Sequence, residues 1–347
     1  MGLFIPVGFL VAASLTTLSS ISKNLFFLQS LWAGLGIAIV IIFLFIDWRS
    51  FLNYRWLIPG LYILSILLLI LVHFKGATIN QAKSWIVFGP FTFQPVELVK
   101  ISLILLFSRY FSRRHLSIAR WKNILTSFIF FIIPAGLVVL QPDLGSTLVL
   151  FGIWFGFLLV SGLPLKRLLV ALVVFVFVGI FMWTSFLKPY QKDRIIGTFY
   201  PEKNILSVNY SVNQAKIAIG SAGFFGKGYG QGPQTQLGFL TEPESDFILA
   251  AIIEEWGYFI GLLVIVAFIF LIFRILKVAA IADQNFEKFI CLGSALALIW
   301  QFFLNVGSTL GLSPVIGVTF PFLSYGGSSL LTSFFLLAII NAIVRKS

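Results

Sequence analysis

The chain has 347 residues, of which 59% are hydrophobic, 17% are aromatic and only 10% are charged. Soluble domains are about 45–50% apolar and about 25% charged, so this composition excludes a water-soluble enzyme or binding module. A net charge of +12 would indicate nucleic-acid binding in a soluble protein, but membrane proteins gather Lys and Arg in their cytoplasmic loops. We therefore expect an all-α, polytopic membrane protein with no nucleic-acid partner.

Apolar segments long enough to cross a bilayer follow one another along the chain. A membrane-spanning helix needs about 20 mostly apolar residues. About ten candidates are found, at 2–17, 27–46, 56–73, 96–111, 124–140, 145–161, 168–187, 247–273, 289–307 and 328–344. No Lys or Arg precedes residues 3–14, so we expect a membrane helix there and not a cleaved signal peptide. The segments predict a single integral membrane domain over 1–347.

Basic residues predict the orientation of these helices. Five of them gather in one short connection: Arg109, Arg113, Arg114, Arg120 and Lys122. Short cytoplasmic loops are enriched in such residues, so we expect both termini in the cytoplasm. The segments 74–95, 188–246 and 308–327 then lie outside, with 188–246 forming a large extracytoplasmic loop. Long loops of specific composition are usually functional.

Ionisable residues within apolar segments are costly to bury and usually serve a function. Glu97 and Lys100 follow Pro95 and are three residues apart, so they share a helix face and can pair. The pair is either structural, or Lys100 binds an anionic substrate. Asp143 separates two apolar runs and either caps the following helix or binds a metal or a basic partner.

The segment 188–246 contains a glycine-rich stretch, Gly220–Gly232. Its glycines permit tight turns and close approach of backbone to a ligand. Lys227 is followed by Gly228 and not by Ser or Thr, so the stretch is not a nucleotide-binding P-loop. Arg194 and Lys227 are candidate ligands for phosphate, although the stretch could also be a solvated loop.

Three alternating acids, Glu242, Glu244 and Asp246, precede the next apolar run. Repulsion among carboxylates can raise the pKa of one of them, and a carboxylate with a raised pKa can act as a general base. Asp246 could instead cap the helix that follows. Glu254 and Glu255 lie further along the same run and must meet water, a cation or basic partners.

A final polar stretch, Ser324–Ser329, precedes the last apolar run. It is either a turn with serine caps or a backbone nest that binds an anion.

Taken in order, these motifs resemble the SEDS family (shape, elongation, division and sporulation) over nearly the whole chain. The resemblance rests on Trp85-Ile86, Gly89-Pro90, Gln94-Pro95-Val96-Glu97-Leu98-Val99-Lys100, Gln141-Pro142-Asp143-Leu144-Gly145, Gly226-Lys227-Gly228, Leu237-Gly238-Phe239-Leu240, Ser245-Asp246-Phe247-Ile248, Glu254-Glu255-Trp256-Gly257, Pro314-Val315-Ile316-Gly317 and Ser324-Tyr325-Gly326-Gly327-Ser328-Ser329. Residues 91–94 and Glu255-Trp256 are closer to the RodA members than to the FtsW members. The chain departs from the family at Ser245, where Thr is usual, and at Ser308, where Met is usual.

The resemblance implies a peptidoglycan glycosyltransferase in the bacterial inner membrane. Such enzymes polymerise lipid II, a disaccharide-pentapeptide on undecaprenyl diphosphate, at the outer leaflet. It further implies that Asp246 is the catalytic carboxylate and that the partner is a class B penicillin-binding protein, a transpeptidase, within an elongation or division complex.

This chemistry needs a base for the acceptor hydroxyl and positive charge for the leaving diphosphate. Asp246 is the candidate base. The candidate substrate-binding residues are Glu97, Lys100, Asp143, Arg194, Lys227 and Ser324. We also expect a divalent cation, Mg or Mn, with Asp143, Glu254 and Glu255 as its candidate ligands.

Two other classes of protein remain open. A lipid II flippase or ion-coupled transporter would use Glu254 and Glu255 as coupling sites near the midplane. A scaffold would only bind a cell-wall synthase. A polymerase, in contrast, needs a laterally open cavity that contains Asp246.

Overall fold

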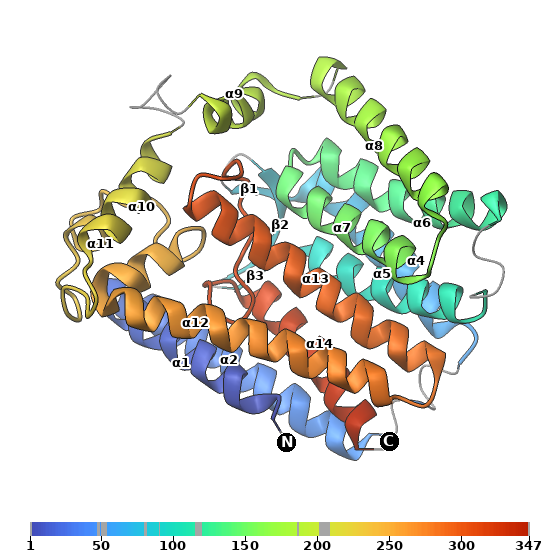
Figure 1. Cartoon of the computed structure of the whole chain (residues 1–347), viewed down its shortest axis with the longest axis horizontal. Helices are drawn as coiled ribbons and strands as arrows, with labels where there is room; N and C mark the ends of the chain where they lie inside the picture. Colours follow the sequence, from blue (N-terminus) through green and yellow to red (C-terminus); the bar gives the residue numbers. More distant parts are fainter. Residues whose placement is uncertain are drawn as a thin grey trace.

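Helices carry the fold of the computed structural model (Figure 1). The structure describes residues 2–46, 49, 54–79, 82–89, 91–114, 120–185, 187–200 and 209–345. The long helices are α1 (Phe4–Ile21), α2 (Lys23–Phe45), α4 (Leu57–Lys75), α5 (Pro95–Ser112), α6 (Trp121–Leu140), α7 (Leu144–Val160), α8 (Leu165–Ser185), α12 (Ile248–Ile281), α13 (Asn285–Thr309) and α14 (Gly327–Val344). The shorter elements are β1 (Ala77–Ile79), β2 (Ala82–Phe88), β3 (Phe91–Phe93), α9 (Pro189–Phe199), α10 (Tyr210–Ser221) and α11 (Pro233–Gln236).

Each apolar segment of the sequence coincides with one long helix, which confirms the all-α prediction. Among the described residues, eight helices are long and apolar enough to cross a membrane. The other two long helices are α7, which has only 17 residues, and α5, which carries Glu97, Lys100 and Arg109. A count of about ten spans therefore stays a prediction. Residues 115–119 of the basic connection lie outside the described residues.

Helices α5, α13 and α14 form the centre of the bundle, and most residues of α5 are buried. The most apolar stretches of α13 and α14 are 61% and 72% buried inside the protein, compared with 22% for α2 and α4. Figure 1 shows α13 between α12 on one side and α5 and α7 on the other. The stretch in α8 is only 6% buried. Helices such as α2, α4 and α8 expose apolar faces on the outside of the bundle. Lipid acyl chains can cover these faces as well as a protein core would.

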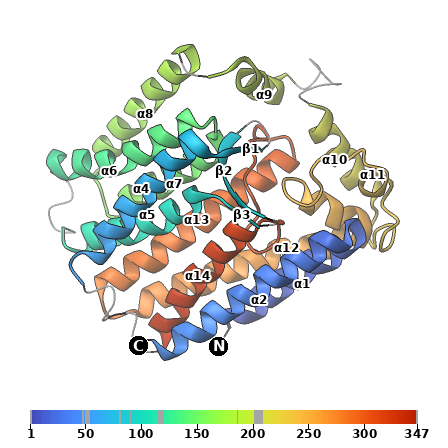
Figure 2. The ribbon, with the colours of Figure 1, turned by 180° about the vertical axis from the view of Figure 1, so that it is seen from behind.

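Irregular segments gather at one end of the bundle. The strands β1, β2 and β3 form an antiparallel sheet in that order, with Ile86 opposite Phe93. The sheet and α9–α11 lie at the end opposite to the two chain termini (Figure 2). The sequence predicted irregular backbone over 74–95, and the sheet within it was not foreseen.

The glycine-rich stretch is built into a break in α12. Gly257 has φ 82° and ψ 175°, a conformation open essentially to glycine alone. The N–H of Lys227 donates to the carbonyl of Glu254 at 3.0 Å, and the N–H of Tyr258 donates to Gly223 at 3.1 Å. A Cβ at Gly257 would lie 2.2 Å from the carbonyl oxygen of Phe224. The glycines therefore let the backbone of the glycine-rich stretch approach α12 closely. The sequence had suggested that they would let it approach a ligand.

Candidate active site

A cavity of about 600 Å³ lies where the three irregular segments meet. Residues of the sheet segment, of α9, of the turn before α12 and of the stretch before α14 all line it. Its charged and hydrogen-bonding lining includes Ser84, Gln94, Asp143, Tyr190, Arg194, Glu242, Glu244, Asp246, Thr319, Ser328 and Ser329. Segments far apart in the sequence thus build one polar chamber at the end of an apolar bundle.

Asp246 lies in the last turn before α12 and lines the cavity. The N-cap residue of α12 is Phe247 and not Asp246, and it makes no side-chain cap hydrogen bond. The backbone carbonyl of Asp246 accepts hydrogen bonds from Asn305 Nδ2 at 3.1 Å and Thr309 Oγ1 at 3.3 Å. Its carboxylate accepts none from the described residues. The backbone is therefore fixed and the carboxylate is left available, which removes the interpretation of Asp246 as a helix cap.

Burial sets the protonation of this carboxylate. It raises the pKa of Asp246 to about 7, with smaller contributions from the negative charges of Glu242 and Glu244 and an opposing one from Arg194. Burial also raises the pKa of Glu244. A carboxyl group whose pKa is near neutral can both accept and release a proton, as a general base must.

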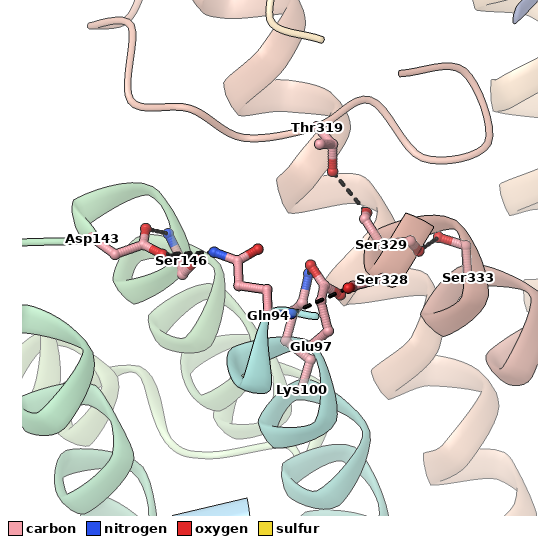
Figure 3. Close-up of polar contacts among 9 residues, drawn as sticks. All are labelled: Gln94, Glu97, Lys100, Asp143, Ser146, Thr319, Ser328, Ser329 and Ser333. Carbon is pink, nitrogen blue, oxygen red and sulfur yellow. Dashed lines mark hydrogen bonds and ion pairs between the residues drawn. The ribbon is translucent and has the colours of Figure 1, made fainter. Parts of the chain in front are cut away.

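Arg194 and Asp143 lie in the same cavity as Asp246. Arg194 projects from α9, and its Nη1 donates to the carbonyl of Val315 at 3.3 Å. Asp143 caps α7, accepting from Ser146 N at 2.9 Å and Ser146 Oγ at 2.8 Å, and Gln94 Nε2 donates to it at 3.0 Å (Figure 3). The capping interpretation of Asp143 is thus confirmed, and the residue faces the cavity as well.

Glu97 and Lys100 form a buried ion pair one turn below the cavity. Lys100 Nζ lies 2.7 Å from Glu97 Oε1, and the two side chains are 4% and 6% exposed. Figure 3 shows the pair beneath Gln94, which itself lines the cavity. The predicted pairing on one helix face is confirmed. Burial raises the pKa of Asp143, and the hydrogen bonds from Ser146 and the positive charge of Lys100 act against this shift.

Lys227, Glu254 and Glu255 lie apart from the cavity. Lys227 Nζ donates to Ser221 Oγ at 2.7 Å and lies 3.6 Å from Glu254 Oε1. The Glu254 carboxylate accepts from the N–H of Gln234 and from the N–H and hydroxyl of Thr235. Glu254 therefore anchors α11.

Glu255 is held in a similar way, and Ser324 also has a structural position. Ser20 Oγ donates to the Glu255 carboxylate at 2.8 Å, and Gln236 Nε2 donates at 2.9 Å. Ser324 Oγ donates to the carbonyl of Ser245 at 2.6 Å and accepts from Phe320 N at 2.8 Å. Ser324 thus fastens the turn that carries Asp246 and does not line the cavity.

The candidate metal ligands do not come together. Among the described residues, no three His, Cys, Asp or Glu side chains are grouped as a metal site. Asp143 lies in the cavity, whereas Glu254 and Glu255 accept hydrogen bonds from α11, and Glu255 also accepts one from Ser20 of α1.

Local sequence reasoning missed several residues of the cavity. Trp32 of α2, Ser84 of β2 and Tyr190 of α9 line it. Trp32 lies in an apolar run that gave no chemical signal, and Ser84 and Tyr190 lie in outer segments whose other residues were singled out. Gln94 stood within a motif, but its bond to Asp143 joins residues 49 positions apart. Only the tertiary arrangement of helices brings such residues together.

Comparison with known proteins gives a consistent set of matches. The family model of FtsW, RodA and SpoVE, described as a cell cycle protein, matches residues 1–347. The peptidoglycan glycosyltransferase MrdB of Escherichia coli strain K12 is 39% identical over 277 residues, which are 79% of this chain and 74% of the relative. The probable peptidoglycan glycosyltransferase FtsW of Haemophilus influenzae is 36% identical over 283 residues, 78% of this chain and 69% of the relative.

A solved structure also matches the fold. It is a chain of a peptidoglycan synthase complex described by its coordination of polymerization and crosslinking. The TM-score is 0.86 at 30% sequence identity, and the match covers 99% of this chain and 97% of the other.

Proposed function

Because the chain belongs to the FtsW/RodA/SpoVE family and is a peptidoglycan glycosyltransferase, we propose that it polymerises lipid II with Asp246 as the general base. The observation that carries this proposal is the Asp246 carboxylate, which lines a polar cavity with no hydrogen-bond partner among the described residues. Its pKa of about 7 suits proton transfer near neutral pH.

The proposed reaction is a single displacement at the anomeric carbon of the donor. Asp246 takes the proton from the 4-hydroxyl of the acceptor N-acetylglucosamine. The oxygen attacks C1 of the donor N-acetylmuramic acid, and a new C1–O bond forms. The C1–O bond to the diphosphate breaks, and undecaprenyl diphosphate leaves with its electron pair. Attack from the face opposite to the leaving group inverts the configuration at C1.

The charge of the cavity supports a need for a cation. Among the described residues that line it, Asp143, Glu242, Glu244 and Asp246 are acids, and Arg194 is the one base. A diphosphate entering such a chamber would be repelled unless countercharge came with it. A divalent cation, Mg or Mn, would supply that charge and take up negative charge on the leaving group.

Asp143 is the residue that best fits such a cation. Three hydrogen bonds reach its carboxylate, which has about four acceptor positions. Magnesium is commonly held by one or two carboxylates together with substrate phosphates. A single protein carboxylate therefore suffices for a cation that arrives with the diphosphate, and the lack of a three-residue cluster within the described part of the chain is consistent with that arrangement.

We place the enzyme in the bacterial inner membrane, with both termini cytoplasmic and the cavity on the outer side, where lipid II is polymerised. Its partner is a class B penicillin-binding protein transpeptidase of an elongation or division complex. The match to a chain of a peptidoglycan synthase complex supports such an assembly. The resemblance to RodA supports elongation.

Two features weigh against the rival classes. A transporter would need its coupling carboxylates to be available for an ion, but Glu254 and Glu255 are held by Thr235, Gln236 and Ser20. A scaffold would need no polar cavity with a free carboxylate. The curated relatives named above are described as glycosyltransferases.

A reconstituted assay tests the proposal. Purified full-length protein in detergent is incubated with labelled lipid II and Mg²⁺ or Mn²⁺, and products are separated on a gel. We expect a ladder of glycan polymer that disappears when EDTA is added and returns with excess cation. Unchanged lipid II under every cation condition would contradict the proposal.

A further inference from the structure

Several helices begin at the cavity. The first turns of three of them, α5, α7 and α14, appear together in Figure 3. The start of a helix leaves backbone N–H groups without intrahelical partners and carries a partial positive charge. The side chain of Asp143 caps α7, and α5 begins at Pro95, which has no N–H to offer. The N-cap residue of α14 is Gly326, and it makes no side-chain cap hydrogen bond.

The first turn of α14 therefore keeps free donors. The N–H groups of Gly327, Ser328 and Ser329 donate to no residue of the described chain, and the first donor in use is Leu330 N, at 2.9 Å from the carbonyl of Gly326. All three residues line the cavity. Their side chains do not replace a cap, because Ser328 Oγ donates to Thr92 and Ser329 Oγ bonds with Thr319 Oγ1 at 2.7 Å.

A second observation points to a ligand in the same cavity. Ser84 of β2 lines it and is only 2% exposed. Its hydroxyl has no hydrogen-bond partner among the described residues. A buried hydroxyl without a partner costs about 1–3 kcal/mol, so this group favours a ligand oxygen that can accept from it.

Neither Asp246 nor Glu244 occupies these donors. Had Asp246 or Glu244 accepted hydrogen bonds from the start of α14, the pKa of each would be lowered by them. Burial instead raises the pKa of both residues, and no bond from α14 contributes. The positive end of α14 thus remains available for an anion from outside the chain.

We propose that the first turn of α14, Gly327–Ser329, together with the hydroxyl of Ser84, binds a phosphate of the diphosphate group in the substrate. This inference rests on the proposed function. Phosphate oxygens commonly accept several N–H groups at a helix start. Donors fixed in place also stabilise charge that develops as the diphosphate leaves sugar C1. The sequence offered Lys100, Arg194 and Lys227 as ligands for phosphate and the stretch Ser324–Ser329 as a backbone nest for an anion. The first turn of α14 develops the second of these, and Lys227 is held instead by Ser221 and Glu254.

The test compares two variants of equal shape. Ser329→Asp places a carboxylate in the first turn of α14, where it satisfies the free donors and repels phosphate, and an acid at this position stabilises a helix. Ser329→Asn has the same size without the charge. Binding of undecaprenyl diphosphate to the purified full-length protein is measured by thermal shift. Undecaprenol serves as the ligand without phosphate, and inorganic pyrophosphate serves as a competitor.

We expect Ser329→Asp to weaken the binding of undecaprenyl diphosphate about tenfold relative to Ser329→Asn, and Ser84→Ala to weaken it less. The affinity for undecaprenol should be the same whichever residue stands at position 329. If inorganic pyrophosphate displaces undecaprenyl diphosphate, the site recognises the diphosphate alone. If only the lipid form competes, the site recognises the diphosphate attached to its lipid. Equal affinity of the Asp and Asn variants would overturn the inference.

The readout also separates this inference from the proposed function. Asp246→Asn should bind undecaprenyl diphosphate at least as tightly as wild type while losing polymerisation. If Asp246→Asn kept its polymerisation activity, the assignment of the base would be wrong and the phosphate site would be unaffected. If substitution of Ser329 did not change binding, the phosphate site would be wrong and the assignment of the base would be unaffected.

Discussion

At the scale of single residues, the cavity separates carboxylates by environment. Asp143 accepts three hydrogen bonds from protein donors, whereas the carboxylate of Asp246 accepts none from the described residues. Both were found from the sequence as acids at the edges of apolar runs. Their roles could not be separated there, because Asp and its position before a helix suit a cap and a base equally well. Only the position of α12, which begins after Phe247, distinguishes them.

The pH dependence of the reaction follows from the pKa of Asp246. A general base works when deprotonated, so activity should rise with pH and be half-maximal near pH 7. Glu242→Gln removes a negative charge that raises this pKa, so the rising limb should move to lower pH. Rates of lipid II polymerisation across pH 5–9 measure this. The assignment would be contradicted if the rising limb of the Glu242→Gln profile lay at the same pH as that of wild type or at a higher pH. The control is Asp283→Asn, in the connection between α12 and α13.

At the scale of elements, the sequence predicted the membrane helices well and the polar end poorly. Apolar runs mark helices such as α13 directly, because each run must face lipid or protein along its whole length. The sheet of β1–β3 has strands of only three to seven residues. The break in α12 depends on Gly257 meeting Phe224, a contact between separate segments. Neither feature leaves a periodic pattern in the sequence.

The break in α12 makes a prediction about stability. Gly257→Ala forces an unfavourable backbone conformation, which costs about 1–3 kcal/mol, and places Cβ against the carbonyl of Phe224. We expect a clear fall in melting temperature and loss of the glycine-rich loop from α12. Gly220→Ala in α10 is the matched control, because nothing lies within 4 Å of its added Cβ. Equal melting temperatures for the two variants would show that the break is not required.

The ion pair of α5 makes a second prediction. Lys100→Met leaves Glu97 as an unpaired charge in a buried site, which typically costs roughly 3–5 kcal/mol. Adding Glu97→Gln to this variant removes the unpaired charge, so the double variant should recover much of the lost stability. Thermal melts of the two single variants and the double variant form the cycle. Losses that simply add would show that the pair has no coupling.

At the scale of the whole molecule, the orientation of the bundle sets the side on which the cavity opens. Gln231, in the glycine-rich loop, and Asp283 are both exposed and lie on segments at opposite ends of the bundle (Figure 1). With Cys291 replaced by Ala, an impermeant thiol reagent should label Gln231→Cys in spheroplasts and Asp283→Cys only after permeabilisation. The reverse pattern would place the cavity in the cytoplasm, where the proposed reaction does not occur.

The most direct test of the account is the activity of Asp246→Asn on lipid II. The substitution preserves the shape of the side chain and removes the group that accepts the proton, and a general base typically contributes about 10²–10⁴-fold in rate. We predict a folded protein with wild-type melting behaviour and polymerisation reduced by at least about 100-fold, while Asp283→Asn stays at the wild-type rate. Glycan synthesis by Asp246→Asn at a rate near wild type would contradict the account.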